Sequence, residues 1–108
     1  MQKHKEQKTE ELFKQLAAEF LQRESSGSSL ITVTSVQISD RFSKALILIS
    51  VFPDHKQDQA LDFARRKRTE FKEYVKERAK MRQLPAIDFA IDFGEKNRQL
   101  IDTLSENK

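Results

Sequence analysis

The 108-residue chain distributes its apolar side chains in several patterns, each typical of one kind of element. After Thr9, an expected N-cap, apolar residues recur every three or four positions as far as residue 23, which predicts an amphipathic helix. Residues 30–38 are rich in β-branched side chains and predict a strand, with a bulge near Ser35 where the alternation changes parity. Residues 45–52 are apolar on both parities, so we expect this strand in the interior of a sheet.

Residues 57–82 have the periodicity of a helix, but a run of cations interrupts it. The run consists of Arg65, Arg66, Lys67 and Arg68. Successive residues of a helix turn by about 100°, so these four side chains sweep most of its circumference and cannot share one solvated face. An unbroken helix of this length would extend about 39 Å, beyond the roughly 34 Å expected across a domain of this size. We therefore predict two helices separated by a kink at Lys67, Arg68 and Thr69, with Thr69 capping the second.

The segment after Pro85 alternates strictly between apolar residues and small or acidic ones, which predicts a strand with one apolar face. Its apolar positions are Ile87, Phe89, Ile91 and Phe93. We assign this face to the core, and expect Asp88 and Asp92 on the opposite, solvated face. An optional short helix follows, containing Leu100, Ile101 and Leu104.

The predicted order of elements is α-β-β-α-α-β. It corresponds to an α+β two-layer sandwich in which helices cover one face of a three-stranded sheet. The length suits one domain. We expect a flexible basic arm at residues 1–8, a single domain at 9–104 and a polar tail at 105–108.

Several chemistries are absent from the sequence. There is no cysteine, and the two glycines are too far apart for a phosphate-binding loop. His4 and His55 have no partner pattern and are expected at the surface, and Asp88 and Asp92 are too widely spaced for paired acid–base catalysis. We therefore predict no enzyme activity, no catalytic residue, no cofactor, no metal site and no small-molecule substrate. No signal peptide or membrane-spanning run is found, so a cytoplasmic protein is expected.

Positive charge is concentrated in one segment. Residues 65–82 contain nine Lys or Arg and three Glu, whereas the rest of the chain has a net charge of −3. The candidate RNA-binding residues are Arg65, Arg66, Lys67, Arg68, Lys72, Lys76, Arg78, Lys80 and Arg82, with Lys3, Lys5 and Lys8 as an auxiliary arm. The lysines at 72, 76 and 80 would form a row able to follow phosphates. From charge alone, a merely solubilising face is equally well supported.

The aromatic residues of the last strand, Phe89 and Phe93, belong to the face assigned to the core. No aromatic strand is then left for base stacking. We expect any RNA binding to depend on the backbone and shape of the RNA more than on its sequence.

The order of elements is that of a type II KH domain, and two stretches resemble the ribosome-binding factor A (RbfA) family. They are "ITVTSVQISDRFSKALILISV" and "MRQLPAIDFAID". The residues that match the family pattern are Val33, Val36, Ser39, Asp40, Ala45, Met81, Arg82, Pro85, Ile87, Phe89 and Asp92. The chain resembles a divergent member, because Lys67, Arg68 and Thr69 replace the family's Ala-x-Gly kink and "SSGSS" replaces an Asp-Pro-Arg turn.

The resemblance implies a bacterial, non-catalytic factor that binds the small ribosomal subunit and its rRNA and assists late folding or processing of 16S rRNA. A monomer is expected. The alternative is a protein-interaction or dimerisation module, in which the basic segment binds an acidic protein partner.

Overall fold

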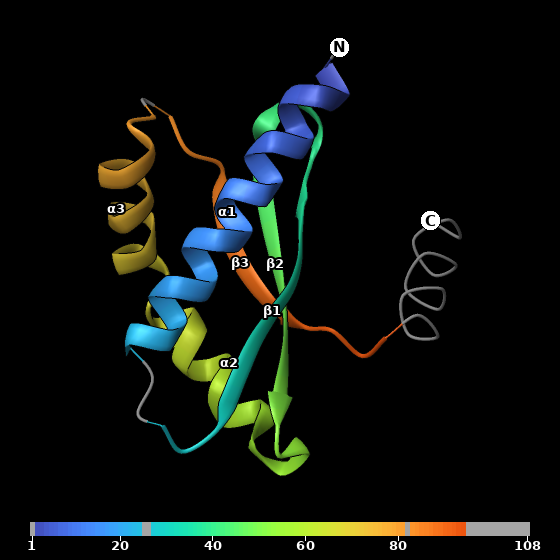
Figure 1. Ribbon diagram of the computed structural model, residues 1–108, viewed down its shortest axis with the longest axis vertical. Helices are drawn as coiled ribbons and strands as arrows, with labels where there is room; N and C mark the ends of the chain where they lie inside the picture. The colour runs from blue at the N-terminus through green and yellow to red at the C-terminus, as the bar shows by residue number, and fades with distance from the viewer. Residues whose placement is uncertain (1, 25–26, 82, 95–108) are drawn as a thin grey trace.

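A computed structural model describes residues 2–24, 27–81 and 83–94. Within these ranges, residues 2–7 and residue 40 are described by their backbone alone. The described elements are helix α1 (Gln2–Glu24), strand β1 (Leu30–Ile38), strand β2 (Lys44–Phe52), helix α2 (Gln57–Arg66), helix α3 (Arg68–Ala79) and strand β3 (Ala86–Ile91) (Figure 1). One 3₁₀ turn (Asp40–Phe42) joins β1 to β2, and another (Asp54–Lys56) precedes α2. The predicted α+β order is confirmed.

The sheet has the order β1-β2-β3, with β1 antiparallel and β3 parallel to β2. Parallel neighbours require a long crossover, and here α2 and α3 provide it. The central position of β2 confirms the expectation from its doubly apolar sequence. On its inward face Ala45, Ile47, Ile49 and Val51 are all buried.

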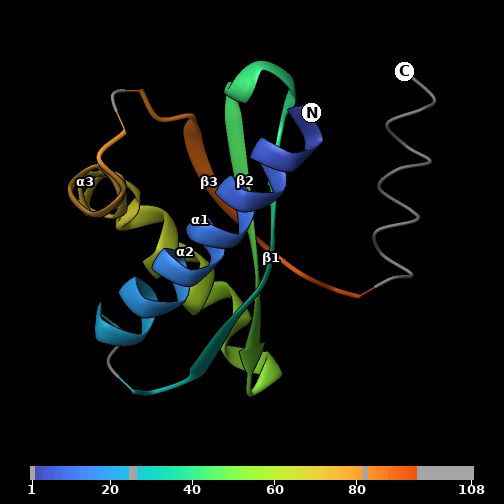
Figure 2. The same cartoon turned by 45° about the horizontal axis from the view of Figure 1, so that its top comes forward.

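One hydrophobic core lies between the sheet and the three helices (Figures 1 and 2). Phe71 of α3 is its aromatic centre. The Phe71 ring lies 5.4 Å from that of Phe20 in α1 and 5.9 Å from that of Phe89 in β3, measured between centroids. These tilted contacts connect both layers of the sandwich.

The predicted bulge in β1 is present. The register with β2 shifts between Val33 and Ser35, so that Val33 and Val36, which have opposite parity, are both buried. Thr34, between them, donates from Oγ1 to the Leu48 carbonyl oxygen at 3.2 Å and to Asp92 Oδ2 at 2.6 Å. Asp92, which we predicted on the solvated face, is therefore also hydrogen-bonded to β1.

Two boundaries differ from the predictions. Helix α1 begins at Gln2, so Thr9 lies inside the helix and not at its N-cap, and the backbone of the predicted arm is helical. The polar residues before Thr9 include Gln, Lys and Glu, whose helix propensity is high enough to extend a helix beyond its core contacts.

At the other end, β3 stops at Ile91, and Phe93 is 60% exposed, so its assignment to the core was wrong. After β3, Gly94 takes a positive φ of 94°, a conformation that glycine adopts readily. The optional helix around Leu100, Ile101 and Leu104 and the tail at 105–108 lie outside the described residues.

Candidate nucleic-acid interface

The chain kinks within the run of four cations, as predicted, and a single residue makes the break. Helix α2 ends at Arg66, α3 begins at Arg68, and Lys67 between them has φ −95° and ψ 8°. The Lys67 amide donates to the Phe63 and Ala64 carbonyls at 3.2 and 3.1 Å, and its carbonyl accepts from the Phe71 amide at 2.8 Å. The backbone therefore stays hydrogen-bonded through the kink.

Thr69 does not cap α3. It lies inside the helix, whose N-cap is Lys67, and no side chain makes a cap hydrogen bond there. Arg68 has a related role at the end of α2, where its Nε donates to the Arg65 carbonyl at 3.1 Å. Because carbonyls at a helix C-terminus lack intrahelical partners, this contact supports the kink.

Three of the four cations are paired with carboxylates of the protein. Arg65 Nε and Arg68 Nη1 both contact Asp88 Oδ1 in β3, at 3.4 and 3.3 Å. Lys67 Nζ lies 3.5 Å from Glu24 Oε1 and 3.3 Å from Glu70 Oε2. The kink therefore exposes these three cations to carboxylates of the protein as well as to solvent.

Within the described part of the chain, the Arg66 side chain makes no ion pair or hydrogen bond. Asp88 lies on the solvated face of β3 as predicted, with its side chain 48% exposed, and it also forms the two ion pairs with Arg65 and Arg68. Its carboxylate lies beside the kink because β3 is the edge strand that α2 and α3 contact.

These ion pairs lie at the surface, and that decides their strength. The side chains of Arg65, Arg68 and Asp88 are 45%, 47% and 48% exposed. Exposed pairs at such distances contribute about 0–1 kcal/mol each. A phosphate can therefore replace Asp88 as the partner of either arginine at small cost.

The pKa of Lys67 is raised above 10.5, chiefly by its hydrogen bond to Glu70, with a smaller contribution from Glu24. A raised pKa means that the ion pairs of Lys67 stabilise the fold near neutral pH, and that this stabilisation is lost as pH rises through the folded value. Lys67 is thus a fixed positive charge at neutral pH.

The two helices bring cations of the run together on one surface. Arg65, Arg66 and Arg68, together with Asp62, line an open depression of about 530 Å³ beside the kink. Two of these arginines come from the last turn of α2 and the third from the first residue of α3. The kink is what places them around one hollow.

The lysine row on α3 is only partly as predicted. Lys72 is half-buried, whereas Lys76 is exposed, and its Nζ lies 3.8 Å from Glu73 Oε2. Lys80 is exposed but sits past the end of α3 in the left-handed conformation, with φ 54°. The row therefore spans Lys72 and Lys76 along the helix and ends at its C-cap.

One arginine of this surface was missed in the sequence. Arg23 of α1 and Arg78 of α3 both lie over the ring of Tyr74, with their guanidinium carbons 5.2 and 4.6 Å from its centroid. The Tyr74 hydroxyl donates to Glu19 Oε1 at 3.3 Å. Only the packing of α1 beside α3 brings Arg23 to the basic surface, because it is remote from residues 65–82 in sequence.

Other predicted residues are not brought into this surface by a described contact. Arg82 lies outside the described residues. Lys3 and Lys5 lie in α1 ahead of the residues whose side chains are described, and Lys8 is exposed on the same helix. Among the described residues, no group of His, Cys, Asp or Glu could hold a metal ion, and no helix has the length and apolar character to cross a membrane.

Comparison with known proteins gives one family. The profile of the family described as Ribosome-binding factor A matches residues 5–105. The chain is similar to the crystal structure of ribosome-binding factor A from Thermus thermophilus, with 24% identity and a TM-score of 0.71, covering 80% of this chain and 94% of that one.

Two further structures are similar. One is a homology model of the Thermus thermophilus protein fitted into a cryo-EM map of a 30S–RbfA complex, with 25% identity, a TM-score of 0.66 and coverage of 74% and 87%. The other is the solution NMR structure of a Thermotoga maritima protein described as a candidate ribosome-binding factor A, with 18% identity, a TM-score of 0.69 and coverage of 81% and 86%. Among curated protein sequences, none matches the chain.

Proposed function

The chain belongs to the ribosome-binding factor A family, and from this premise we propose that it binds the small ribosomal subunit through its basic helical surface. In this proposal it assists the late folding or processing of 16S rRNA without making or breaking a bond. The Thermus relative fitted into a 30S complex supports the choice of partner. We place this function in the bacterial cytoplasm.

The observation that carries the proposal is the kink at Lys67, with three arginines around one open depression. Guanidinium groups match phosphate oxygens in geometry and charge. Asp88, the present partner of Arg65 and Arg68, is half exposed and holds them weakly. RNA phosphates can therefore take over these arginines, and each contact releases counterions from the RNA.

The protein would act by differential binding. A surface that fits one conformer of the rRNA better than its alternatives shifts the population toward that conformer. The shift in the conformational equilibrium of the rRNA equals the difference in binding free energy between the two conformers. A few phosphate contacts made by only one conformer are therefore enough to favour it. No catalytic group is needed for this effect.

Charge reversal tests the proposal. The variant carries Arg66→Glu, Arg68→Glu and Lys72→Glu, and we expect it to lose co-sedimentation with small subunits while its melting temperature stays near that of the wild type. The matched control changes three cations away from the kink: Lys14→Glu, Lys44→Glu and Lys56→Glu. It alters the net charge equally and should still co-sediment.

Unchanged co-sedimentation of the Arg66, Arg68 and Lys72 variant would refute the basic surface as the binding site. Equal loss in both variants would indicate that only net charge matters. If the protein is instead a module for an acidic protein partner, binding to purified rRNA will be absent while binding to the partner persists.

A further inference from the structure

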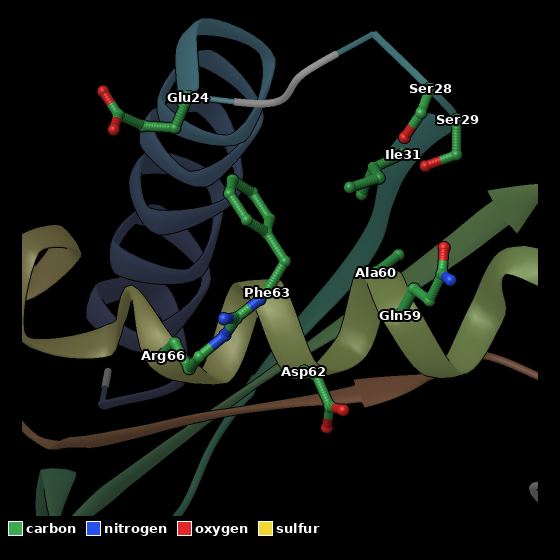
Figure 3. A pocket seen from close by; sticks show the side chains of 9 residues that line it. All are labelled: Glu24, Ser28, Ser29, Ile31, Gln59, Ala60, Asp62, Phe63 and Arg66. Atoms are coloured by element: carbon green, nitrogen blue, oxygen red, sulfur yellow. The ribbon is translucent and has the colours of Figure 1, made fainter.

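A second hollow adjoins the basic depression and differs from it in chemistry. It has a volume of about 420 Å³ and lies between the C-terminal end of α1, the start of β1 and α2 (Figure 3). Its apolar wall is formed by Ile31, Ala60 and Phe63, and polar groups such as Ser29, Gln59 and Arg66 surround this wall.

We propose that this pocket receives one unpaired base of the bound RNA, stacked on the ring of Phe63, while Arg66 holds the adjoining phosphate. The inference rests on the proposed function and adds a ligand class and a location to it. It assigns base contact to a part of the fold for which the sequence predicted contact with backbone and shape alone.

The shape and lining of the pocket fit a planar heterocycle. Figure 3 shows the Phe63 ring projecting from α2 into the space between the end of α1 and Ile31. A base entering there would have an aromatic face on one side and an aliphatic side chain on the other. Stacking of this kind favours any base, because each has a π-face. The Gln59 amide and Ser29 hydroxyl supply donors and acceptors at the rim.

Arg66 connects the pocket to the phosphate-binding surface. It lines both this pocket and the basic depression, and it follows Phe63 by three residues on α2, so both side chains lie on neighbouring positions of one helix face. Among the described residues Arg66 makes no ion pair, so it is available to a phosphate without the loss of an internal contact.

The acids at the rim favour a base over a phosphate inside the pocket. Glu24 and Asp62 line it, and their negative charges disfavour a phosphate there. Glu24 is itself held by Lys67 at 3.5 Å and by Arg23 at 3.4 Å. Lys67 Nζ also lies 6.0 Å from the centroid of the Phe63 ring. These contacts place cations beside Glu24 and beside the Phe63 ring.

The test uses a short single-stranded RNA that contains 2-aminopurine, whose fluorescence falls when the base stacks. With the wild-type protein we expect the fluorescence to be quenched on binding. Phe63→Leu keeps an apolar side chain but removes the aromatic face, and it should weaken binding about tenfold and restore most of the fluorescence. The salt dependence of binding should stay the same, because no phosphate contact is lost.

Phe93→Leu is the matched control. Phe93 is exposed beyond the end of β3, which lies at the opposite edge of the sheet from β1, and it does not line the pocket, so its replacement should change neither affinity nor fluorescence. A second measurement needs no variant: titration of the wild-type protein with the same RNA should shift the amide resonances of Ala60 and Phe63. This keeps the inference testable if Phe63→Leu unfolds.

The outcomes separate the two proposals. RNA binding that is unaffected by Phe63→Leu, with no shift at Ala60 and Phe63, would overturn the base pocket and leave the basic surface standing. A wild-type protein that fails to bind RNA would overturn the proposed function, and this inference with it.

Discussion

Replacing Asp88 by asparagine removes the carboxylate that two arginines of the kink share. Arg65 Nε and Arg68 Nη1 contact the same oxygen, Asp88 Oδ1, at 3.4 and 3.3 Å. Asparagine has nearly the same shape, and its carbonyl oxygen can still accept the Phe89 amide, which donates to Asp88 Oδ1 at 2.8 Å. The substitution therefore changes charge with little change in packing.

The magnitude follows from the exposure of the three side chains. An exposed ion pair contributes about 0.2–1 kcal/mol to stability. Because the side chains of these two pairs are about half exposed, we take their combined contribution as about 1 kcal/mol. Asp88→Asn should therefore lower the free energy of unfolding by no more than about 1 kcal/mol. If RNA binding breaks both pairs, their removal should raise affinity for RNA by up to about fivefold.

The salt dependence of binding gives a sharper signal than affinity. In the wild-type protein Asp88 acts as an internal counterion, and its displacement releases no ion into solution. In the variant the two arginines recruit anions from the buffer, and RNA binding displaces them. The slope of log affinity against log salt should therefore be steeper for the variant, because release of these anions adds to the contribution of about 0.7 to 0.9 per phosphate contact that both proteins share.

The assay is fluorescence anisotropy with a small-subunit rRNA fragment at several KCl concentrations. Glu11→Gln is the control, because it changes the net charge equally on an exposed part of α1. Tighter binding and a steeper slope for Asp88→Asn alone would support the exchange of Asp88 for phosphate. If Asp88→Asn binds RNA no better than Glu11→Gln, or less tightly than the wild type, the exchange is refuted.

Three further predictions concern the fold. Phe71→Ala should lower the free energy of unfolding by about 3–5 kcal/mol in chemical denaturation, because it empties the aromatic centre of the core; a loss under about 1 kcal/mol would contradict this. Ser35→Ala should raise the free energy of unfolding by about 1 kcal/mol, because the described contacts leave the buried Ser35 hydroxyl without a hydrogen-bond partner. Thr34→Val should lower the free energy of unfolding by a similar amount, because it removes the hydrogen bond to Asp92. A change in the same direction for both variants would be inconsistent with the bulge geometry. The melting-temperature difference between wild type and Lys67→Met should be constant near neutral pH and should fall as pH rises above 10.5, because the pKa of Lys67 is raised above that ordinary value in the folded state; a difference that does not change over that rise in pH would show that its pKa is not raised.

The element order and the kink could be predicted because they depend on local patterns. A run of four cations cannot share one helix face, and the kink at Lys67 follows from that geometry. The change of parity near Ser35 required a bulge to keep Val33 and Val36 on one face, and the structure has it. Phe93 was assigned wrongly because alternation alone does not reveal where a strand loses its neighbour.

The candidate site was predictable in composition but not in geometry. The run of cations marks the surface in sequence, yet the acid that holds two of them, Asp88, lies some twenty residues further along. Arg23 was missed for the same reason, because nothing in α1 indicates that its last turn will stack on Tyr74. The pocket at Phe63 likewise joins α2 to the start of β1.

The sequence by itself determined the order of the elements, the central place of β2, the bulge, the kink and the clustering of positive charge along one segment. Each of these features depends on residues that are close together in the sequence. Steric limits and the periodicity of helices and strands are therefore enough to predict it. The tertiary structure alone decided which cations form ion pairs and which remain accessible to a phosphate. It also decided that the Phe63 ring lines a pocket next to these cations. These features depend on contacts between distant segments, and only the packing of helices against the sheet brings those segments together.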